Sequence, residues 1–265
     1  MEKLVAVCNL SYQNILKDIS FNIKEGSFIA ISGTNKCGKT TLIKILSGLL
    51  EQKENITFEK CSLDSIPKTE IYKKIGYVIP GVEMPFRFSS IEQELWFALE
   101  SGELDQEKKE KHYKKVISLL KLKNDQQLDP NYLSHFLKVK LLLARTILAS
   151  PKILYLDNIC SSLTKEEREE IRNILKKLNK EEHITIVMTT NRLEEVIDLD
   201  KLYVLDNGEI VLSGKPLEVL KEDSMLAKMG LSLPFMVDLS LKLKYYDLLE
   251  EIELDMERLV NTLWK

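Results

Sequence analysis

The sequence predicts an α/β fold, and three observations support this prediction. Short apolar stretches typical of strands alternate along the chain with stretches whose apolar residues recur at helical spacing. A strand-like stretch at 27–32 leads through a polar, glycine-containing turn into a helical stretch at 40–50. From 89 to 150 the patterns are helical. We therefore expect a core of strands and helices that carries a separate helical insert.

The same patterns predict the individual elements in chain order. The first are strands at 4–7, 19–23 and 27–32, the helix at 40–50 and a strand at 75–79, followed by residues that break regular structure. Helices at 89–101, 103–115 and 132–150 come next, then strands at 152–157 and 185–189. A hairpin at 201–214 turns at 206–208, and the chain from about 216 on is helical and rich in leucine. The stretch 53–75 shows no clear pattern.

Length and composition exclude several classes of protein. The chain has 265 residues, 44% hydrophobic and 30% charged, as in folded rather than disordered proteins. Its 38 basic and 41 acidic residues give a formal charge of −3, without the basic excess that a nucleic-acid partner would require. Its apolar stretches are shorter than the roughly 18 residues of a membrane-spanning helix, and its first residues lack the apolar core of a signal peptide. Four cysteines without metal-site or redox spacing fit a reducing, cytosolic compartment.

The strongest motif is GTNKCGKT at 33–40, which fits the phosphate-binding pattern G-x-x-x-x-G-K-[ST]. Gly33 and Gly38 let the backbone bend so that successive N–H groups point into one anion-sized hollow, and the following helix adds the positive end of its dipole. Lys39 is expected to neutralise the outer phosphates, and Thr40 to offer its hydroxyl to Mg²⁺. By chance, the four fixed positions coincide in roughly one chain in a hundred of this length. The motif therefore predicts a nucleotide site.

Asp157 is the candidate partner of this loop. It follows the apolar strand at 153–156, where a carboxylate would hold Mg²⁺ through water, opposite Thr40. An aspartate after an apolar stretch is, on its own, typical of a strand-ending turn. The metal role of Asp157 therefore depends on the phosphate loop.

These residues and others resemble the ATP-binding subunits of ABC transporters over nearly the whole chain. The segment YLSHFLKVKLLLARTILASPKILYLDN is similar to the family's signature helix and second nucleotide motif, and KLYVLDNGEIVLSGKPLEVL to its closing hairpin. The tail GLSLPFMVDLSLKL…ERLVNTLW (230–264) resembles the C-terminal extension of the energy-coupling-factor group, which powers vitamin and metal-ion uptake. A bland pair of apolar helices would give a similar tail.

The resemblance implies a fold and a division of the chain. The fold is a P-loop NTPase (RecA-like) core with an N-terminal antiparallel β subdomain, a helical insert that carries the signature, and a short helical C-terminal extension. The implied boundaries are 1–88 and 151–215 for the core, 89–150 for the helical subdomain and 216–265 for the extension. We expect the extension to mediate dimerisation and its Trp264 to be a packing residue.

The resemblance also implies the site residues and cofactors, which are ATP and Mg²⁺. Tyr12 stands where the family has the aromatic residue that stacks on adenine, and Ser134 where it has the signature serine. The retained catalytic positions are Lys39 and Asp157, and the metal ligands are Thr40 and Asp157. The implied ATP-binding residues are Tyr12, Gly33, Asn35, Cys37, Gly38, Lys39, Thr40 and Thr41.

Three positions of the catalytic machinery depart from the family pattern. Pro80 stands in place of the glutamine that senses Mg²⁺ and the attacking water, and it has neither its donor nor its acceptor. Asn158 replaces the general-base glutamate, a loss that typically costs about 10²–10⁴ in rate because an amide does not take a proton from water. Asn191 replaces the histidine that touches the γ-phosphate.

Two further departures also lie in the machinery that surrounds the γ-phosphate. Thr164 replaces an aspartate of the family, and the signature reads Leu133-Ser134-His135-Phe136-Leu137. We expect the bulk of His135 and Phe136 to hinder close approach to a γ-phosphate. These changes predict a subunit that binds ATP but whose own site hydrolyses it weakly or not at all, unless Glu83 or another carboxylate serves as the base.

The sequence thus predicts an ATP-binding subunit of an importer, peripheral at the cytoplasmic face of the cell membrane. In the family two subunits pair head to tail, and each ATP lies between one phosphate loop and the other signature. A homodimer would carry two damaged sites, so we expect a heterodimer with a second ABC ATPase. We expect a polytopic membrane subunit to dock on this chain near residues 79–88. The alternative is a non-enzymatic, nucleotide-gated regulatory module. A soluble ABC protein acting on ribosomes or DNA is disfavoured by the chain's length and near-neutral charge.

Overall fold

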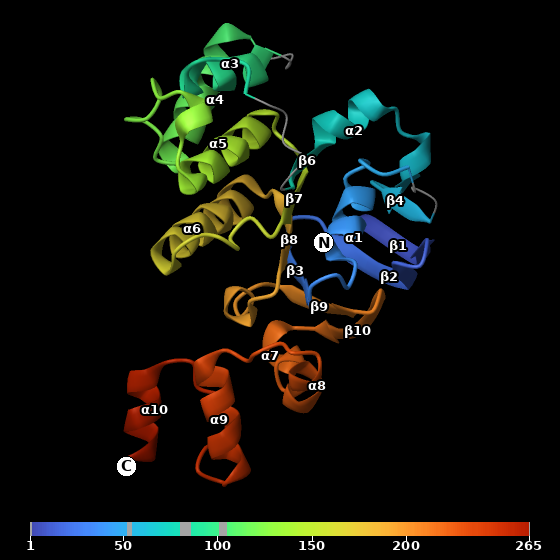
Figure 1. The fold of residues 1–265 in the computed structure, drawn as a ribbon, viewed down its shortest axis with the longest axis vertical. Helices are drawn as coiled ribbons and strands as arrows, with labels where there is room; N and C mark the ends of the chain where they lie inside the picture. Colours follow the sequence, from blue (N-terminus) through green and yellow to red (C-terminus); the bar gives the residue numbers. More distant parts are fainter. Residues whose placement is uncertain (1, 52–54, 80–85, 101–104, 265) are drawn as a thin grey trace.

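A computed structural model describes residues 2–51, 55–79, 86–100 and 105–264 of the chain. A six-stranded sheet lies at its centre, a four-stranded sheet lies on one side, and helices lie on the other (Figure 1). This architecture confirms the α/β prediction. Among the described residues, none of the helices combines the length and the apolar composition needed to cross a membrane.

The four-stranded sheet is antiparallel and lies near the N-terminus, as the resemblance implied. Its order is β2-β1-β4-β5, and its strands are β1 (Lys3–Tyr12), β2 (Leu16–Lys24), β4 (Ile56–Phe58) and β5 (Cys61–Ser62). From Ile19 to Ile23 alternate side chains are buried and the others are exposed. This alternation is typical of a sheet with one face against the core and one in solvent.

The six-stranded sheet has the order β10-β9-β3-β8-β7-β6, and every neighbouring pair is parallel except the hairpin of β9 and β10. All residues of β3, β7 and β8 are buried, because both faces of the sheet are covered. The strands are β3 (Phe28–Gly33), β6 (Ile75–Val78), β7 (Ile153–Asp157), β8 (Thr185–Thr190), β9 (Lys201–Asp206) and β10 (Glu209–Gly214).

Helices follow most of these strands, and a few short 3₁₀ turns join them. The helix before β7, α5, and the helix after it, α6, carry long apolar faces. The helices are α1 (Lys39–Leu46), α2 (Lys68–Lys74), α3 (Ile91–Glu100), α4 (Gln106–Leu119), α5 (His135–Leu148), α6 (Lys165–Glu182), α7 (Pro216–Val219), α8 (Asp223–Lys228), α9 (Phe235–Tyr245) and α10 (Met256–Leu263).

Two hydrophobic cores lie on the two faces of the six-stranded sheet. Ile29 and Tyr155 pack on the face shared with α1 and the four-stranded sheet. Ala30 and Leu154, their neighbours along the same strands, pack on the opposite face with α3, α4, α5 and α6. Successive strand residues point to opposite faces, so each strand contributes to both cores. Because β3, β7 and β8 are parallel, they end at the same edge of the sheet, and the loop before α1 lies at that edge.

The sequence patterns did not predict α2, α6 or the short strands β4 and β5. The helix α6 is 18 residues long, and many charges separate its buried residues, which obscures its apolar face. A start signal was present in the sequence, since Thr164 and Glu167 form a capping box at its N-terminus. Thr164 therefore has a structural role in this chain.

The C-terminal helices α9 and α10 lie at the end of the molecule farthest from the helical insert (Figure 1). The hydroxyl of Ser240 in α9 donates to the carbonyl of Glu253 at 2.9 Å and accepts from its N–H at 3.1 Å, which fixes the segment between the two helices. Trp264 is 80% exposed, so the prediction that it is a packing residue is wrong for this chain.

The turn between β9 and β10 is tied to the phosphate loop. Gly208 has a φ of +85°, donates its N–H to the carbonyl of Cys37 at 3.1 Å, and accepts from the N–H of Lys17 at 2.8 Å. A Cβ at this position would lie 2.2 Å from the carbonyl oxygen of Ile15. Only glycine therefore fits this turn without displacing backbone next to the loop.

We expect Gly208→Ala to lower the free energy of unfolding by about 2–4 kcal/mol, because a left-handed alanine is strained and the backbone of Ile15 must also move. Urea unfolding of the purified chain measures the loss. Gly230→Ala is the control, since Gly230 also has a positive φ, +72°, but nothing lies within 4 Å of the added carbon. That variant should lose only about 1 kcal/mol; equal losses for the two variants would contradict the steric explanation.

Candidate nucleotide-binding site

The loop between β3 and α1 is built around two glycines. A Cβ at Gly33 would lie 2.1 Å from the carbonyl oxygen of Leu205 in β9, and a Cβ at Gly38 would lie 2.7 Å from the side chain of Leu16. Both positions therefore require glycine because neighbouring strands approach closely. Lys36 between them has a φ of +66°. A left-handed residue inside a tight loop is the conformation from which backbone anion nests are built.

The side chain of Lys39 lies against this loop from the first turn of α1. Its Nζ donates to the carbonyl oxygens of Gly33 at 2.7 Å and Thr34 at 2.6 Å, and it lies 3.6 Å from Sγ of Cys37. The N-cap of α1 is Gly38, which has no side chain to cap the first N–H groups. A positive charge and a helix N-terminus thus meet where the sequence predicts the phosphates.

The two predicted metal ligands lie in contact. Thr40 Oγ1, in the first turn of α1, donates to Oδ2 of Asp157, at the end of β7, at 2.7 Å. Hard oxygen ligands suit Mg²⁺, which proteins usually bind through one or two side chains plus phosphates and water. The described residues hold no group of three acidic, histidine or cysteine side chains that could bind a metal alone. The donor set therefore fits Mg²⁺ held jointly with a nucleotide.

Tyr12 lies at the border of the same loop. It ends β1, and the turn that follows it carries Ile15, whose carbonyl faces both Gly38 and Gly208. Tyr12 is half-buried. Asn35 lies exposed at the tip of the loop and Thr41 in the first turn of α1. Contact of Tyr12, Asn35, Cys37 and Thr41 with ATP stays a prediction.

Asn158 occupies the position next to Asp157 in a left-handed conformation, with a φ of +51°. Its N–H donates to the carbonyl oxygen of Thr189 at 3.2 Å and to Oγ1 of the same residue at 3.0 Å. Thr189 Oγ1 donates in turn to Oδ1 of Asp157 at 2.5 Å. Sequence analysis did not identify Thr189. The two threonines that end the apolar strand were a signal, but the partner of each hydroxyl depends on strand register.

Asn191 follows β8 on an exposed turn. Thr190 Oγ1 accepts from the N–H of Arg192 at 3.0 Å and donates to Oε2 of Glu195 at 2.7 Å, so the hydroxyl ties both sides of this turn together. Burial raises the pKa of the Glu195 carboxyl, although the Thr190 hydroxyl and the Arg168 charge oppose that shift.

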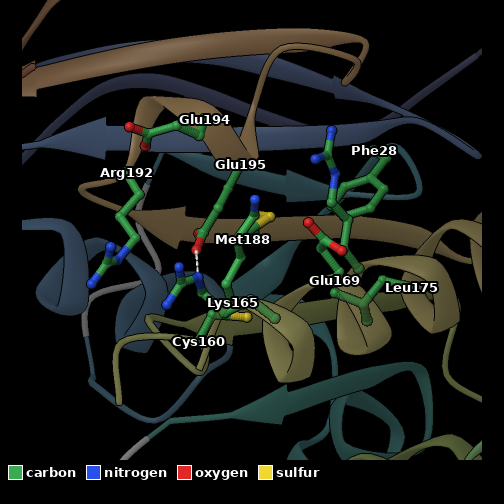
Figure 2. Close-up of a pocket in the computed structure, with 11 residues that line it drawn as sticks. Phe28, Cys160, Lys165, Glu169, Leu175, Met188, Arg192, Glu194 and Glu195 are labelled. Carbon is green, nitrogen blue, oxygen red and sulfur yellow. Dashed lines mark ion pairs between the residues drawn. The ribbon is translucent and has the colours of Figure 1, made fainter. Parts of the chain in front are cut away.

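A cavity of about 270 Å³ lies beside this turn (Figure 2). Phe28, Met188 and Leu175 supply apolar walls, and Glu195 is paired across it with Arg168, at 3.7 Å between Oε1 and Nε. Burial raises the pKa of the Cys160 thiol, which also borders the cavity, to about 12. This thiol is therefore protonated at neutral pH and is a poor nucleophile. No motif predicted the cavity, because its walls come from β3, β8 and α6.

The altered signature begins α5. Ser134 is the N-cap of this helix, and its Oγ accepts from the N–H of Leu137 at 3.3 Å. His135 is exposed, whereas the ring of Phe136 packs against the core beneath Lys140, whose Nζ lies 4.5 Å from the ring centroid. The ring of Phe136 is half-buried, and hindrance of a γ-phosphate by His135 and Phe136 stays a prediction.

Pro80 and Glu83 lie outside the described residues, as does most of the predicted docking segment 79–88. The end of that segment is held by Glu94, which is 2% exposed. Its Oε1 accepts from the N–H groups of Arg87 and Phe88, the latter at 2.8 Å. A buried carboxylate thus fixes the chain where it enters the helical insert.

Known proteins are similar to this chain in sequence and in fold. A family model described as ABC transporter matches residues 16–161. The energy-coupling factor transporter ATP-binding protein EcfA of Enterococcus faecium is 31% identical over 94% of this chain and 90% of its own length. EcfA1 of Lactobacillus delbrueckii subsp. bulgaricus is 29% identical over 94% of this chain and 90% of its own length.

Two solved structures with a similar fold also come from ABC transporters. CbiO1 from Clostridium perfringens, described as part of the ABC transporter complex CbiONQ, is 27% identical, covers 90% of this chain and 99% of its own, and has a TM-score of 0.77. A nucleotide-free ATP-binding cassette of an ABC transporter, 22% identical with a TM-score of 0.73, shares the fold over 86% of this chain and 98% of its own. The chain therefore belongs to the ABC transporter ATP-binding proteins, which bind ATP with Mg²⁺, and within them to the energy-coupling factor group.

Proposed function

We propose that this chain is the ATP-binding subunit of an energy-coupling-factor importer, in which ATP binding and hydrolysis drive solute uptake through membrane partners. The contact of Thr40 with Asp157, beside the loop that surrounds Lys39, carries the proposal. It joins a cation for the phosphates to a pair of oxygens for Mg²⁺ at one edge of the sheet. The 31% identical relative is named as an energy-coupling factor transporter ATP-binding protein.

The chain's own site, in this proposal, hydrolyses ATP weakly or not at all. Asn158 occupies the position of the base, and its amide accepts no proton from water. Asn191 offers an amide on its exposed turn where the family has an imidazole. Pro80 extends the same pattern in the sequence. The groups that hold the triphosphate and the metal are present, whereas the groups that act on the attacking water and the γ-phosphate are replaced.

A heterodimer follows from this division, because one intact partner would supply the base, the glutamine and the histidine for a second site. The C-terminal extension supports pairing. Phe235, Tyr245, Tyr246 and Trp264 are 66%, 81%, 70% and 80% exposed on or beside α9 and α10. Aromatic side chains left exposed together at one end of a chain are typical of a surface that another protein covers.

The membrane subunit docks, in this proposal, where the chain enters the helical insert, at the cytoplasmic face of the membrane. Phe97 is 43% exposed, its ring centroid lies 5.4 Å from that of Phe88, and the guanidinium of Arg87 lies 5.5 Å from the Phe97 ring. An aromatic pair with one cation suits a helix that carries apolar and acidic side chains. Glu94 accepts the backbone N–H groups of Arg87 and Phe88 and so holds these two residues in place.

The alternative is a regulatory module that dimerises on ATP without turning it over. The retained ATP ligands combined with Asn158 and Asn191 favour it over a plain ATPase. It predicts no membrane partner, which separates it from the importer.

The test is to tag the chain, purify it from gently solubilised native membranes and identify the proteins that accompany it. The importer predicts a second ABC ATPase with the glutamate that Asn158 replaces, together with a polytopic membrane protein. Recovery of this chain alone in the soluble fraction would overturn the importer and leave the regulatory module.

We expect Lys39→Ala to abolish most of the affinity for MgATP, because the outer phosphates lose their cation. Isothermal calorimetry on the purified chain measures the change. Lys44→Ala, which removes one positive charge from the last turn of the same helix, should bind as the unmodified chain does. Equal affinities of Lys39→Ala and the unmodified chain would contradict the phosphate-loop assignment.

Asn158→Glu restores a carboxylate at the position of the base, but we expect only a small rise in turnover of the purified chain, since Pro80 and Asn191 remain. Phosphate release at saturating MgATP gives the rate. Asn158→Gln matches the size of the glutamate without its charge. A large rise in turnover, seen with glutamate and not with glutamine, would show that the missing base was the only defect.

A further inference from the structure

Asp157 is the only residue among the predicted magnesium ligands that carries a charge, and two hydroxyl groups bind it from two different elements. Thr40 Oγ1 donates to its Oδ2 at 2.7 Å and Thr189 Oγ1 donates to its Oδ1 at 2.5 Å. Asp157 is 5% exposed and Thr189 is 1% exposed. A buried carboxylate oxygen without a donor is costly, so the second hydroxyl is needed where solvent is excluded.

The strand register explains how Thr189 reaches this carboxylate. Asp157 is paired with Thr189 across β7 and β8. Tyr155 and Val187, two residues earlier on each strand, both face the core that contains α1. Because side chains alternate along a strand, Asp157 and Thr189 face α1 as well, on the side from which Thr40 approaches. Thr190 points to the opposite face, where its hydroxyl meets Glu195.

The hydroxyl of Thr189 uses both its donor and its acceptor. It donates to Asp157 and accepts the N–H of Asn158 at 3.0 Å. It therefore fixes the orientation of the carboxylate and, at the same time, the left-handed turn that follows it. A Thr40 hydroxyl that donates its proton to Oδ2 still has lone pairs for a cation. Holding Oδ1 with a separate donor keeps Oδ2 aimed at Thr40.

We propose that Thr189 is a positioning residue of the magnesium site: its hydroxyl sets the Asp157 carboxylate so that Thr40 and Asp157 accept Mg²⁺ together. The proposal rests on the proposed function as an ATP-binding subunit. Thr189 itself does not touch the metal. Partners of metal ligands that hold them by hydrogen bonds typically change metal affinity by about 10–100-fold when removed.

The variant Thr189→Val removes the hydroxyl and keeps the shape of the side chain, whereas Thr189→Ser keeps the hydroxyl. Thr185→Val is the matched control, since Thr185 lies on the same strand and is fully buried. Its Oγ1 accepts the N–H of Gly26 at 2.9 Å, as Thr189 Oγ1 accepts that of Asn158, but Thr185 donates no bond to Asp157. Thermal melting identifies any variant that fails to fold, and Thr189→Ala, which adds no bulk, replaces Thr189→Val in that case.

The measurement is the affinity of each chain for ATP by calorimetry, once in excess EDTA and once across a titration of Mg²⁺. We expect Thr189→Val to bind ATP in EDTA as the unmodified chain does and to require about 10–100-fold more Mg²⁺ for the tighter complex. Thr189→Ser and Thr185→Val should keep the magnesium dependence of the unmodified chain. This separates a role in positioning Asp157 from a general loss of stability.

Three results would overturn the proposal. They are an unchanged magnesium dependence in Thr189→Val, an equal loss in Thr185→Val, and an unmodified chain whose ATP affinity does not respond to Mg²⁺. An unmodified chain that binds no ATP in either condition would instead overturn the proposed function, so the two failures are distinct.

Discussion

The hydrogen bond between Thr40 and Asp157 is the interaction around which the site is built. It joins the first turn of α1 to the end of β7, 117 residues away in the sequence. The bond is possible because β3 and β7 are parallel strands on either side of β8. Parallel strands end at the same edge of a sheet, and ligands bind at that edge. The phosphate loop after β3 and the carboxylate at the end of β7 therefore lie next to each other as a result of the strand order alone.

The phosphate loop could be predicted from the sequence because its residues form a local motif. Gly33, Gly38 and Lys39 lie within seven residues of one another, and the order strand, loop, helix fixes their relation, so the motif alone predicted the loop. Thr189 could not be identified from the sequence, because its hydrogen-bond partner depends on which strand lies beside β7 and in which register. The helix α6 was missed for a different reason, since its charged face outweighs the apolar residues that it buries.

The neighbouring threonines at the end of β8 divide the polar contacts of this edge between two faces. Thr189 faces α1 and donates its hydroxyl to Asp157, whereas Thr190 faces the cavity and donates its hydroxyl to Glu195. Burial raises the pKa of the Glu195 carboxyl. Asn191 follows directly and is exposed. The turn that carries Asn191 is therefore bonded to the cavity side, through Thr190. Thr190 thus separates the predicted magnesium ligands from Asn191.

This separation fits the proposal that the chain keeps its nucleotide site although its hydrolytic residues are replaced. Lys39, Thr40 and Asp157 are bonded into the loop, α1 and β7, so their replacement would leave buried or closely packed groups without partners. Asn191 lies on an exposed turn, and the bonds of Asn158 in the strand-ending turn run through its backbone. Substitution of such side chains costs the fold little. The groups proposed to bind ATP thus also hold the structure together, whereas the side chains at the positions proposed for hydrolysis do not.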